Sequence, residues 1–274
     1  MNGTDSGYEP VMKIGLEPRD HFRVDPPGDK MYKIAHITDT HLGQHKRTVY
    51  KSLGGTGSQP VDVQVRSFTR FKKIIELLQF LNPDIVVHSG DIAERGLIDQ
   101  QNQLRKMYSN IDNSLPEVQF LYIRGNHDCN RSTRLIRELF PEWDFHPIND
   151  SEKVNLIDKQ MIIVGSDYQE VGNTGDFDFD PPEINTDVIT IGAFHQSFRN
   201  VSRSYDADVA LTSTAPDGQS VNDYYDILLL GHMHSDYFDF DGGCRIVEGR
   251  WFVDLFTFTT AGSHFQRFPI YQGE

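Results

Sequence analysis

Five short motifs in the sequence carry side chains that can bind metal ions, and each follows an apolar run typical of a β-strand. In chain order they are Asp39-Thr40-His41, Gly90-Asp91, Gly125-Asn126-His127-Asp128, His195 and Gly231-His232-Met233-His234. Carboxylate, imidazole and amide groups are ligands that hard or borderline divalent cations prefer. Because the ends of neighbouring parallel strands meet in one crevice, we expect these distant residues to form one site.

The spacing within the motifs suits metal coordination. Asp39 and His41 are separated by one residue, as are His232 and His234, so the alternation of a strand places both members of each pair on one side. Asp91 has two carboxylate oxygens and can bridge two cations. Two ions held about 3.5–4 Å apart clamp an anionic ester and lower the pKa of a bound water.

The third motif combines a ligand with a candidate catalytic group. Asn126 offers a neutral amide oxygen, which limits the negative charge beside an anionic substrate. His127 follows it and is itself followed by Asp128. An imidazole oriented by a carboxylate is a suitable general acid for a leaving alkoxide. We therefore predict His127 and Asp128 as a catalytic pair beside the metal ligands.

Basic side chains close to two of the motifs are candidate contacts for a substrate phosphate. His45, Lys46 and Arg47 follow the first motif, and Arg95 follows Asp91 by four residues. Cationic side chains in such positions bind phosphate oxygens. The alternative is an ordinary solvated surface for the first three and a structural ion pair for Arg95.

Apolar, β-branched runs predict the strands that carry the motifs. They lie at 32–38, 84–89, 118–124, 161–165, 188–194 and 226–230, with one or two closing strands over 245–259. Apolar positions spaced by three and four predict a helix over 64–81, ended by Asn82-Pro83. Further helices are expected over about 98–110 and 131–140. This order favours a layered α/β fold with packed sheets and outer helices.

The sequence also predicts the limits of the folded domain and one flexible loop within it. Residues 1–30 are rich in Gly, Pro, Asp and Glu without periodicity, which predicts a flexible tail or a loosely docked arm. Residues 31–274 are expected to form a single domain. Residues 52–60, rich in Gly and Ser, are expected to form a flexible loop.

Composition limits the partners and the compartment. The net charge of −14 repels nucleic acid and anionic membranes at long range. No apolar run reaches the roughly 18 residues that a membrane span requires, and the N-terminus has no signal-like region. Two cysteines, Cys129 and Cys244, exclude a disulfide framework. The sequence therefore predicts a cytoplasmic protein without a membrane partner.

The ordered set of motifs resembles the calcineurin-like metallophosphoesterase superfamily over residues 39–234. The resemblance implies a four-layer αββα sandwich of two mixed sheets flanked by helices. It implies a dinuclear centre with one metal held by Asp39, His41, Asp91 and His234, and the other held by Asp91, Asn126, His195 and His232. It also implies that His127 protonates the leaving group or steadies the transition state.

The branch within this superfamily is left open by the motifs. The first motif is similar to that of double-strand-break repair nucleases, but those usually carry a histidine where this chain has Glu94. Their DNA-capping domain also does not fit in the 40 residues after His234. Residues 90–96 instead resemble a block of the phosphoprotein phosphatases, in which the arginine equivalent to Arg95 binds phosphate. The small cyclic-nucleotide phosphodiesterases share the general pattern and a comparable length.

These observations predict a metal-dependent phosphoester hydrolase in which a dinuclear centre activates water. A phosphodiester is favoured over a monoester, and the substrate is a small molecule or a nucleic acid. The alternatives are a DNA exonuclease or endonuclease, and a non-catalytic scaffold of the same fold that binds proteins. The expected cofactors are two divalent ions, Mn2+ first, with Fe, Zn and Ni also compatible with the ligands.

Overall fold

A computed structural model gives the fold. It describes residues 9–10, 12–16, 31–42, 46–52, 58–64, 67–94, 118–128, 134, 137–138, 144–148, 154–156, 160–168, 188–196, 224–232, 236–241, 244–249 and 252–270. Among these residues, no helix is both long and apolar enough to cross a membrane.

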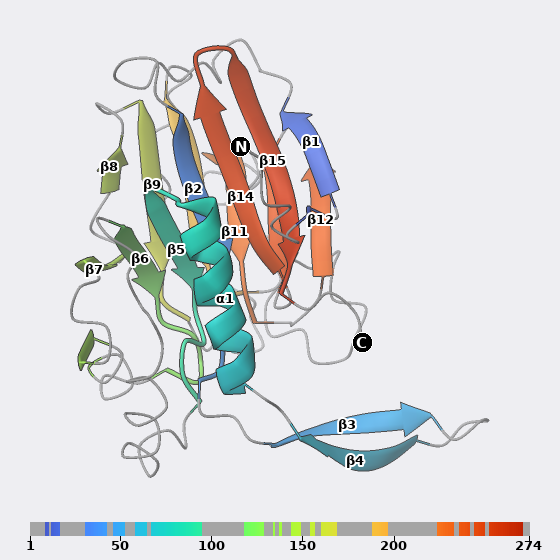
Figure 1. Cartoon of the computed structure of the whole chain (residues 1–274). Coiled ribbons are helices and arrows are strands. Elements are labelled where there is room, and N and C mark those ends of the chain that lie inside the picture. The colour runs from blue at the N-terminus through green and yellow to red at the C-terminus, as the bar shows by residue number, and fades with distance from the viewer. Residues whose placement is uncertain are drawn as a thin grey trace, which may run out of the picture.

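Two mixed sheets form the body of the molecule (Figure 1). The first has the order β1 (Met12–Leu16), β15 (Gly262–Pro269), β14 (Phe252–Thr259), β2 (Tyr32–Ile37), β5 (Ile85–Ser89), β6 (Gln119–Ile123) and β7 (Asp144–Pro147). The second has the order β12 (Asp236–Asp241), β13 (Cys244–Gly249), β11 (Ile227–Leu230), β10 (Ile189–Phe194), β9 (Met161–Ser166) and β8 (Val154–Leu156). Each sheet contains four consecutive parallel strands. They are β2-β5-β6-β7 in the first sheet and β13-β11-β10-β9 in the second. The predicted α/β architecture with two mixed sheets is confirmed.

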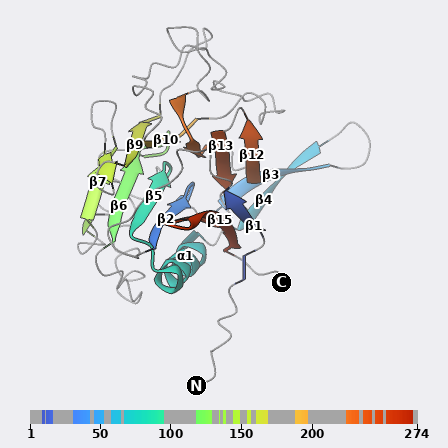
Figure 2. The ribbon, with the colours of Figure 1, turned by 90° about the horizontal axis from the view of Figure 1, so that it is seen from above.

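Helix α1 (Ser67–Leu81) covers the outer face of the first sheet, and the second sheet lies against the inner face (Figure 2). The helix ends where Asn82 adopts a left-handed conformation with φ of 48° and its N–H donates to the Leu78 carbonyl at 2.8 Å. This is a common way to end a helix, and Pro83 follows it. The predicted helix end is therefore confirmed.

The two faces of the first sheet contribute to two separate cores. On β2, Ala35 and Ile37 pack toward α1, while Ile34 packs between the sheets. On β5, Val86 faces the helix and Val87 faces the second sheet. This alternation is the period of a strand buried on both sides. The carboxyl ends of the parallel strands are thereby fixed from both faces.

Three predictions from the sequence differ from the structure at their boundaries. Residues 12–16, inside the segment expected to be a tail or docked arm, form strand β1, which pairs with β15 at the sheet edge. The loop expected over 52–60 is wrong at both ends, because β3 (Lys46–Ser52) and β4 (Ser58–Gln64) form an antiparallel ribbon. The helix predicted from 64 begins at Ser67, since Gln64 belongs to β4.

The ribbon of β3 and β4 projects away from the two sheets (Figure 1). Its strands pair Val49 with Val61 and Tyr50 with Pro60, and β-branched and aromatic residues favour such pairing. Residues 53–57 lie outside the described part of the chain, as does the helix expected over 98–110. Within 131–140, the described residues Arg134, Arg137 and Glu138 are helical. Strands β7, β8, β12 and β15 were not predicted.

Candidate metal centre and active site

The predicted metal ligands lie where parallel strands end. Asp39 follows β2 and Asp91 follows β5 in the first sheet, while His195 directly follows β10 in the second. Four of the five non-glycine residues described with positive φ are predicted ligands, namely Asp39 (50°), His41 (42°), Asp91 (54°) and His232 (99°). Such conformations cost roughly 1–3 kcal/mol each and persist only where the surrounding structure fixes them. The ligand-bearing turns are therefore held by tertiary contacts.

Glycines allow these turns to approach one another. A Cβ atom on Gly90, whose φ is 95°, would collide with the His195 ring. A Cβ atom on Gly125 would collide with the Asp91 carboxylate, and one on Gly231 would lie 2.8 Å from Nδ1 of His195. The glycines that begin three of the motifs are thus required for close packing of the ligands.

Asp91 lies at the centre of the site. Its Oδ2 atom is 3.4 Å from Nε2 of His41 and 3.3 Å from Nε2 of His195. Nε2 of His41 is also 3.8 Å from Oδ1 of Asp39. Donor atoms of Asp39, Asp91 and His195 lie within 4.8 Å of one another. One carboxylate therefore contacts imidazoles from both sheets.

A second group of ligands adjoins His195. The Asn126 amide oxygen lies 3.2 Å from Nε2 of His195 and 3.2 Å from Nδ1 of His232. The two imidazole rings are 5.2 Å apart. The His232 backbone N–H donates to both carboxylate oxygens of Asp39, at 3.2 and 3.3 Å. The motifs after β2, β6, β10 and β11 thus meet in one place.

Hydrogen bonds at the far side of two rings leave their Nε2 atoms available. The Nδ1–H of His195 donates to the Ser89 carbonyl at 2.7 Å, and Nδ1 of His41 lies 3.1 Å from Oε2 of Glu94. When a metal ion displaces the proton on Nε2, the Nδ1–H group keeps its acceptor, so Nε2 is the nitrogen of each ring that can bind a cation. Metal-binding histidines are commonly oriented in this way.

The charges of the site favour a bound cation. Asp39 and Asp91 are 0 and 1% exposed, and buried carboxylates require pairing or a metal. Burial lowers the pKa of His195, but its hydrogen bond and charge interaction with Asp91 outweigh burial and raise that pKa to about 9. Burial would raise the pKa of Asp91, but His195 and His41 hold it below its usual range. In this state the protons on the imidazoles supply the positive charge that a metal would supply, so the donor set fits divalent ions.

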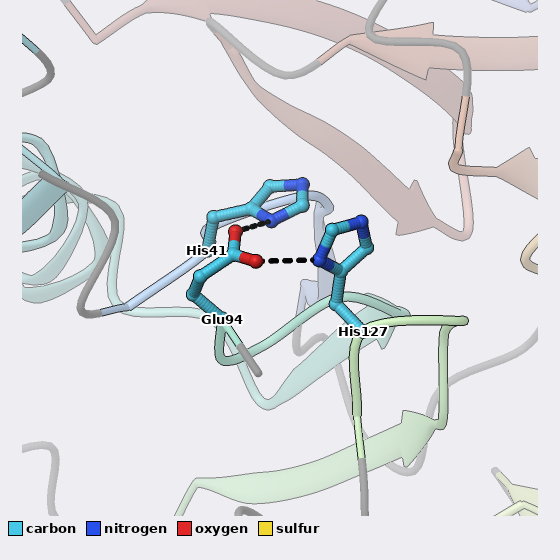
Figure 3. A group of neighbouring side chains, drawn as sticks. All are labelled: His41, Glu94 and His127. Carbon is cyan, nitrogen blue, oxygen red and sulfur yellow. Dashed lines mark hydrogen bonds and ion pairs between the residues drawn. The ribbon is translucent and has the colours of Figure 1, made fainter. Parts of the chain in front are cut away.

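Glu94 lies between two histidines of the site (Figure 3). Its Oε1 atom is 2.8 Å from Nδ1 of His127, and its Oε2 atom is 3.1 Å from Nδ1 of His41. The two imidazole rings meet edge to face at 4.8 Å. Hydrogen bonds from His127 and His41 hold the pKa of the Glu94 carboxyl well below its usual range. Glu94 is therefore an ionised carboxylate that orients both rings.

This arrangement corrects the predicted partnership of His127 with Asp128. The Asp128 carboxylate instead accepts the backbone N–H groups of Ile92, Ala93 and Gly125 at 2.9–3.1 Å. Burial raises the pKa of Asp128 to about 6, although these hydrogen bonds act in the opposite direction. Asp128 thus connects the turn that follows Asp91 with the turn that begins at Gly125. The carboxylate that binds the His127 ring is that of Glu94.

Some predicted residues cannot be placed. His234, His45 and Arg95 lie outside the described residues. Lys46 and Arg47 begin strand β3, but only their backbone is described.

Tyr168 is a neighbour of the site that sequence reasoning missed. It follows β9, and its ring lies 5.3 Å from that of His232 and 6.1 Å from that of His195. Its backbone N–H donates to the Arg124 carbonyl, and Arg124 pairs with Asp167 at 2.5–2.7 Å. Its position in the sequence could have indicated this, because residues 167–168 follow an apolar strand, as the metal ligands do.

Comparison with known proteins identifies the family. The model of the calcineurin-like phosphoesterases matches residues 32–236, which is most of the chain and includes all five motifs. The chain belongs to this family. The family is one of phosphoesterases that use divalent metals, which agrees with the presence of ligands at the strand ends.

One curated relative is a probable cyclic nucleotide phosphodiesterase from Vesicomyosocius okutanii subsp. Calyptogena okutanii (strain HA). It is 27% identical over 125 residues, which are 43% of this chain and 46% of the relative. The alignment therefore spans less than half the length of that protein.

Two solved structures share the fold. A dimetal phosphatase from Danio rerio has a TM-score of 0.52 at 10% identity, covering 90% of this chain and 98% of the other. The protein TT1561 of Thermus thermophilus has a TM-score of 0.50 at 10% identity, covering 84% of this chain and 100% of the other. At this identity the likeness supports the fold of two packed sheets and nothing further.

Proposed function

We propose that the protein is a phosphodiesterase that uses two divalent ions bridged by Asp91. The observation that carries this proposal is the position of the Asp91 carboxylate, whose Oδ2 lies 3.3 and 3.4 Å from Nε2 of His195 and His41. These histidines come from different sheets, and each directs its Nε2 atom, which would lose its proton when a metal ion binds, at the same carboxylate oxygen. A carboxylate in this position suits a bridging ligand.

The remaining residues divide between two cations. We assign Asp39, His41, Asp91 and His234 to one ion, and Asp91, Asn126, His195 and His232 to the other. The mixture of oxygen and nitrogen ligands without a required thiolate suits Mn2+, with Fe, Zn and Ni as alternatives. Bound in pairs, such ions lower the pKa of water and stabilise the attacking and leaving oxygens of a phosphoester.

His127 and Glu94 supply the proton transfer in this proposal. During hydrolysis the oxygen of water bonds to phosphorus, the bond from phosphorus to the leaving oxygen breaks, and that oxygen needs a proton. With Nδ1 of His127 held by Glu94 at 2.8 Å, its Nε2–H is the group that donates this proton. The ionised carboxylate stabilises the imidazolium before transfer.

The choice of a diester draws on the relative and on the surface beside the site. The relative with 27% identity is named a probable cyclic nucleotide phosphodiesterase. In this chain, Tyr168 places an aromatic ring beside His232, where a flat base or aryl group of a substrate can pack. Lys46 and Arg47 begin the ribbon that follows the first motif, and we propose that they contact the substrate phosphate together with His45 and Arg95.

The test uses metal-stripped protein reloaded with Mn2+ and three substrates, namely bis-p-nitrophenyl phosphate, p-nitrophenyl phosphate and a linear DNA duplex. The proposal expects hydrolysis of the diester and two ions per chain, with both ions lost from Asp91→Ala. Turnover of the monoester alone would replace it with a phosphatase, and degradation of DNA would replace it with a nuclease. Two bound ions without any turnover would contradict catalysis and favour a scaffold.

A further inference from the structure

Arg70, on helix α1, reaches the turn that carries the first two metal ligands. One of its guanidinium nitrogens donates to the carbonyl of Asp39 at 2.9 Å and to the carbonyl of Thr40. The side chain is 1% exposed and is among the largest wholly buried side chains described. Charged side chains are almost never fully buried unless they are paired, so this placement needs a reason.

The two carbonyls belong to a strained segment. Asp39 and His41 both have positive φ, which places Thr40 between two left-handed residues. L-residues adopt this conformation at a cost, and it persists where surrounding groups over-determine it. A single cationic donor that binds two successive carbonyls fixes their relative direction. That direction in turn sets where the Asp39 carboxylate and the His41 imidazole point.

The opposite side of the turn is tied to the second ligand motif. The N–H groups of Asp39 and His41 donate to the carbonyls of Gly90 and Asp91 at 3.1 and 2.9 Å. The Thr40 hydroxyl donates to the Ile92 carbonyl at 2.9 Å. These bonds fix the position of the turn relative to Asp91, while the bonds from Arg70 fix its carbonyls from the helix side.

A buried histidine completes this support. Because the Thr40 hydroxyl gives its proton to Ile92, it accepts from Nε2–H of His88 at 3.0 Å. Arg70 and His88 therefore both form hydrogen bonds with Thr40. Arg70 binds its carbonyl, and His88 binds its hydroxyl. Both lie beneath the turn rather than in the ligand cluster.

We propose that Arg70 is a positioning residue that holds the Asp39-Thr40-His41 turn in its metal-binding conformation. The hydrogen bonds of Arg70 described above are to backbone carbonyls, and its effect reaches the metal through them. The consequence for metal binding rests on the proposed function of the site. The consequence for the backbone does not, because the turn is held in the metal-free protein.

The experiment compares Arg70→Met with Arg70→Lys, which keeps a cationic donor, and with Arg134→Met. Arg134 is 80% exposed and pairs with Glu138 on the surface, so its loss controls for removal of an arginine from the chain. Hydrogen exchange of the metal-free full chain is followed at residues 39–42 and, as an internal reference, at the buried strand β11. Mn2+ affinity is then measured by calorimetry.

For Arg70→Met we expect exchange at residues 39–42 to rise about tenfold or more while β11 is unchanged, and Mn2+ affinity to fall about 10–100-fold, as for other groups that orient metal ligands. Arg70→Lys should restore part of both effects, and Arg134→Met should match the wild type. If Arg70 instead stabilised the whole fold, Arg70→Met would raise hydrogen exchange equally at residues 39–42 and at β11, and Arg70→Lys would not restore either.

Wild-type exchange and Mn2+ affinity in a folded Arg70→Met protein would overturn the proposal, as would exchange that rises equally at β11. If Arg70→Met fails to fold, Arg70→Lys decides, because the proposal then requires a local rise at residues 39–42. A wild-type protein that binds no Mn2+ would refute the proposed function, and the exchange comparison would still decide the role of Arg70.

Discussion

Replacement of Glu94 by glutamine tests whether this carboxylate supports the proton transfer by His127. The substitution keeps the shape of the side chain and removes its charge. In the structure Glu94 binds Nδ1 of His127 at 2.8 Å and Nδ1 of His41 at 3.1 Å, and it is about one-fifth exposed. With the amide oxygen toward His127, that contact can persist as a hydrogen bond to a neutral group, whereas the NH2 group of glutamine cannot accept from Nδ1–H of His41.

The expected magnitude follows from the difference between charged and neutral hydrogen bonds. A hydrogen bond to a charged group contributes about 1.5–3 kcal/mol and a neutral one about 1 kcal/mol. The imidazolium form of His127 therefore loses about 0.5–2 kcal/mol of stabilisation, which corresponds to a fall in kcat of roughly 2–30-fold. Weaker support of His41 should also reduce metal affinity about 10–100-fold.

The assay separates these two effects. At saturating Mn2+, kcat is compared for a diester with an alkoxide leaving group and for bis-p-nitrophenyl phosphate, whose leaving group departs without a proton. The full fall is expected only for the alkyl diester, because general acid catalysis matters most for poor leaving groups. Asp128→Asn is the matched control, since Asp128 binds backbone N–H groups of both ligand turns instead.

Two results would refute this reasoning. Equal losses for both leaving groups in Glu94→Gln would mean that the carboxylate does not act through His127. A loss in Asp128→Asn that depended on the leaving group would restore the pairing of neighbouring residues that the sequence suggested.

Three further substitutions have defined outcomes. Gly125→Ala should displace the Asp91 carboxylate, because a Cβ atom at this position would collide with it. Mn2+ affinity, measured by titration, should fall at least tenfold. Wild-type affinity would show that the turn can shift to accommodate the methyl group. His127→Asn should keep two ions per chain by metal analysis but slow turnover of alkyl diesters, whereas loss of metal would make His127 a ligand. Burial lowers the pKa of His88 to about 3, below the value of about 6.5 in the unfolded chain, so its contribution to stability is present above pH 6.5 and is lost as the pH falls toward 3. Denaturant unfolding should therefore show wild-type stability falling by up to about 1.4 kcal/mol per pH unit more steeply than that of His88→Gln between pH 6 and 4, and equal slopes would contradict a neutral buried His88.

The elements that carry the metal ligands were predictable because their signals are local. Each of the strands β2, β5, β10 and β11 is a short apolar run, and its ligand motif follows within two residues of the strand end. Helix α1 shows its period directly and stops at a residue pair that cannot continue it. Since parallel strands of one sheet bring their ends together, the proximity of Asp39 and Asp91 followed from the order of the strands. His195 comes from the second sheet and joins them because the two sheets pack together.

The errors arose where a partner is distant or where a local signal misleads. Strand β1 has no visible pattern, and its partner β15 lies about 250 residues further along the chain. The Gly- and Ser-rich composition around 52–60 is typical of a loop and gives no sign of the strands that end at Ser52 and begin at Ser58. Adjacency in sequence suggested Asp128 as the partner of His127, whereas the backbone turn directs that carboxylate toward N–H groups and leaves the position to Glu94.

The strand order of the first sheet has a consequence for how the chain is made. Strand β2, which leads to the first metal ligands, has β14 as its neighbour on one side, and within the described part of the chain β1 pairs with β15 alone. A ribosome therefore releases most of the domain before either partner exists, and in the meantime the buried edge of β2 is open to pairing with other chains. Long-range strand pairing of this kind is intrinsically slow. The first ligand turn thus reaches its final environment only after β14 and β15 insert, so metal loading is expected to be a late event that follows synthesis of residues 252–269.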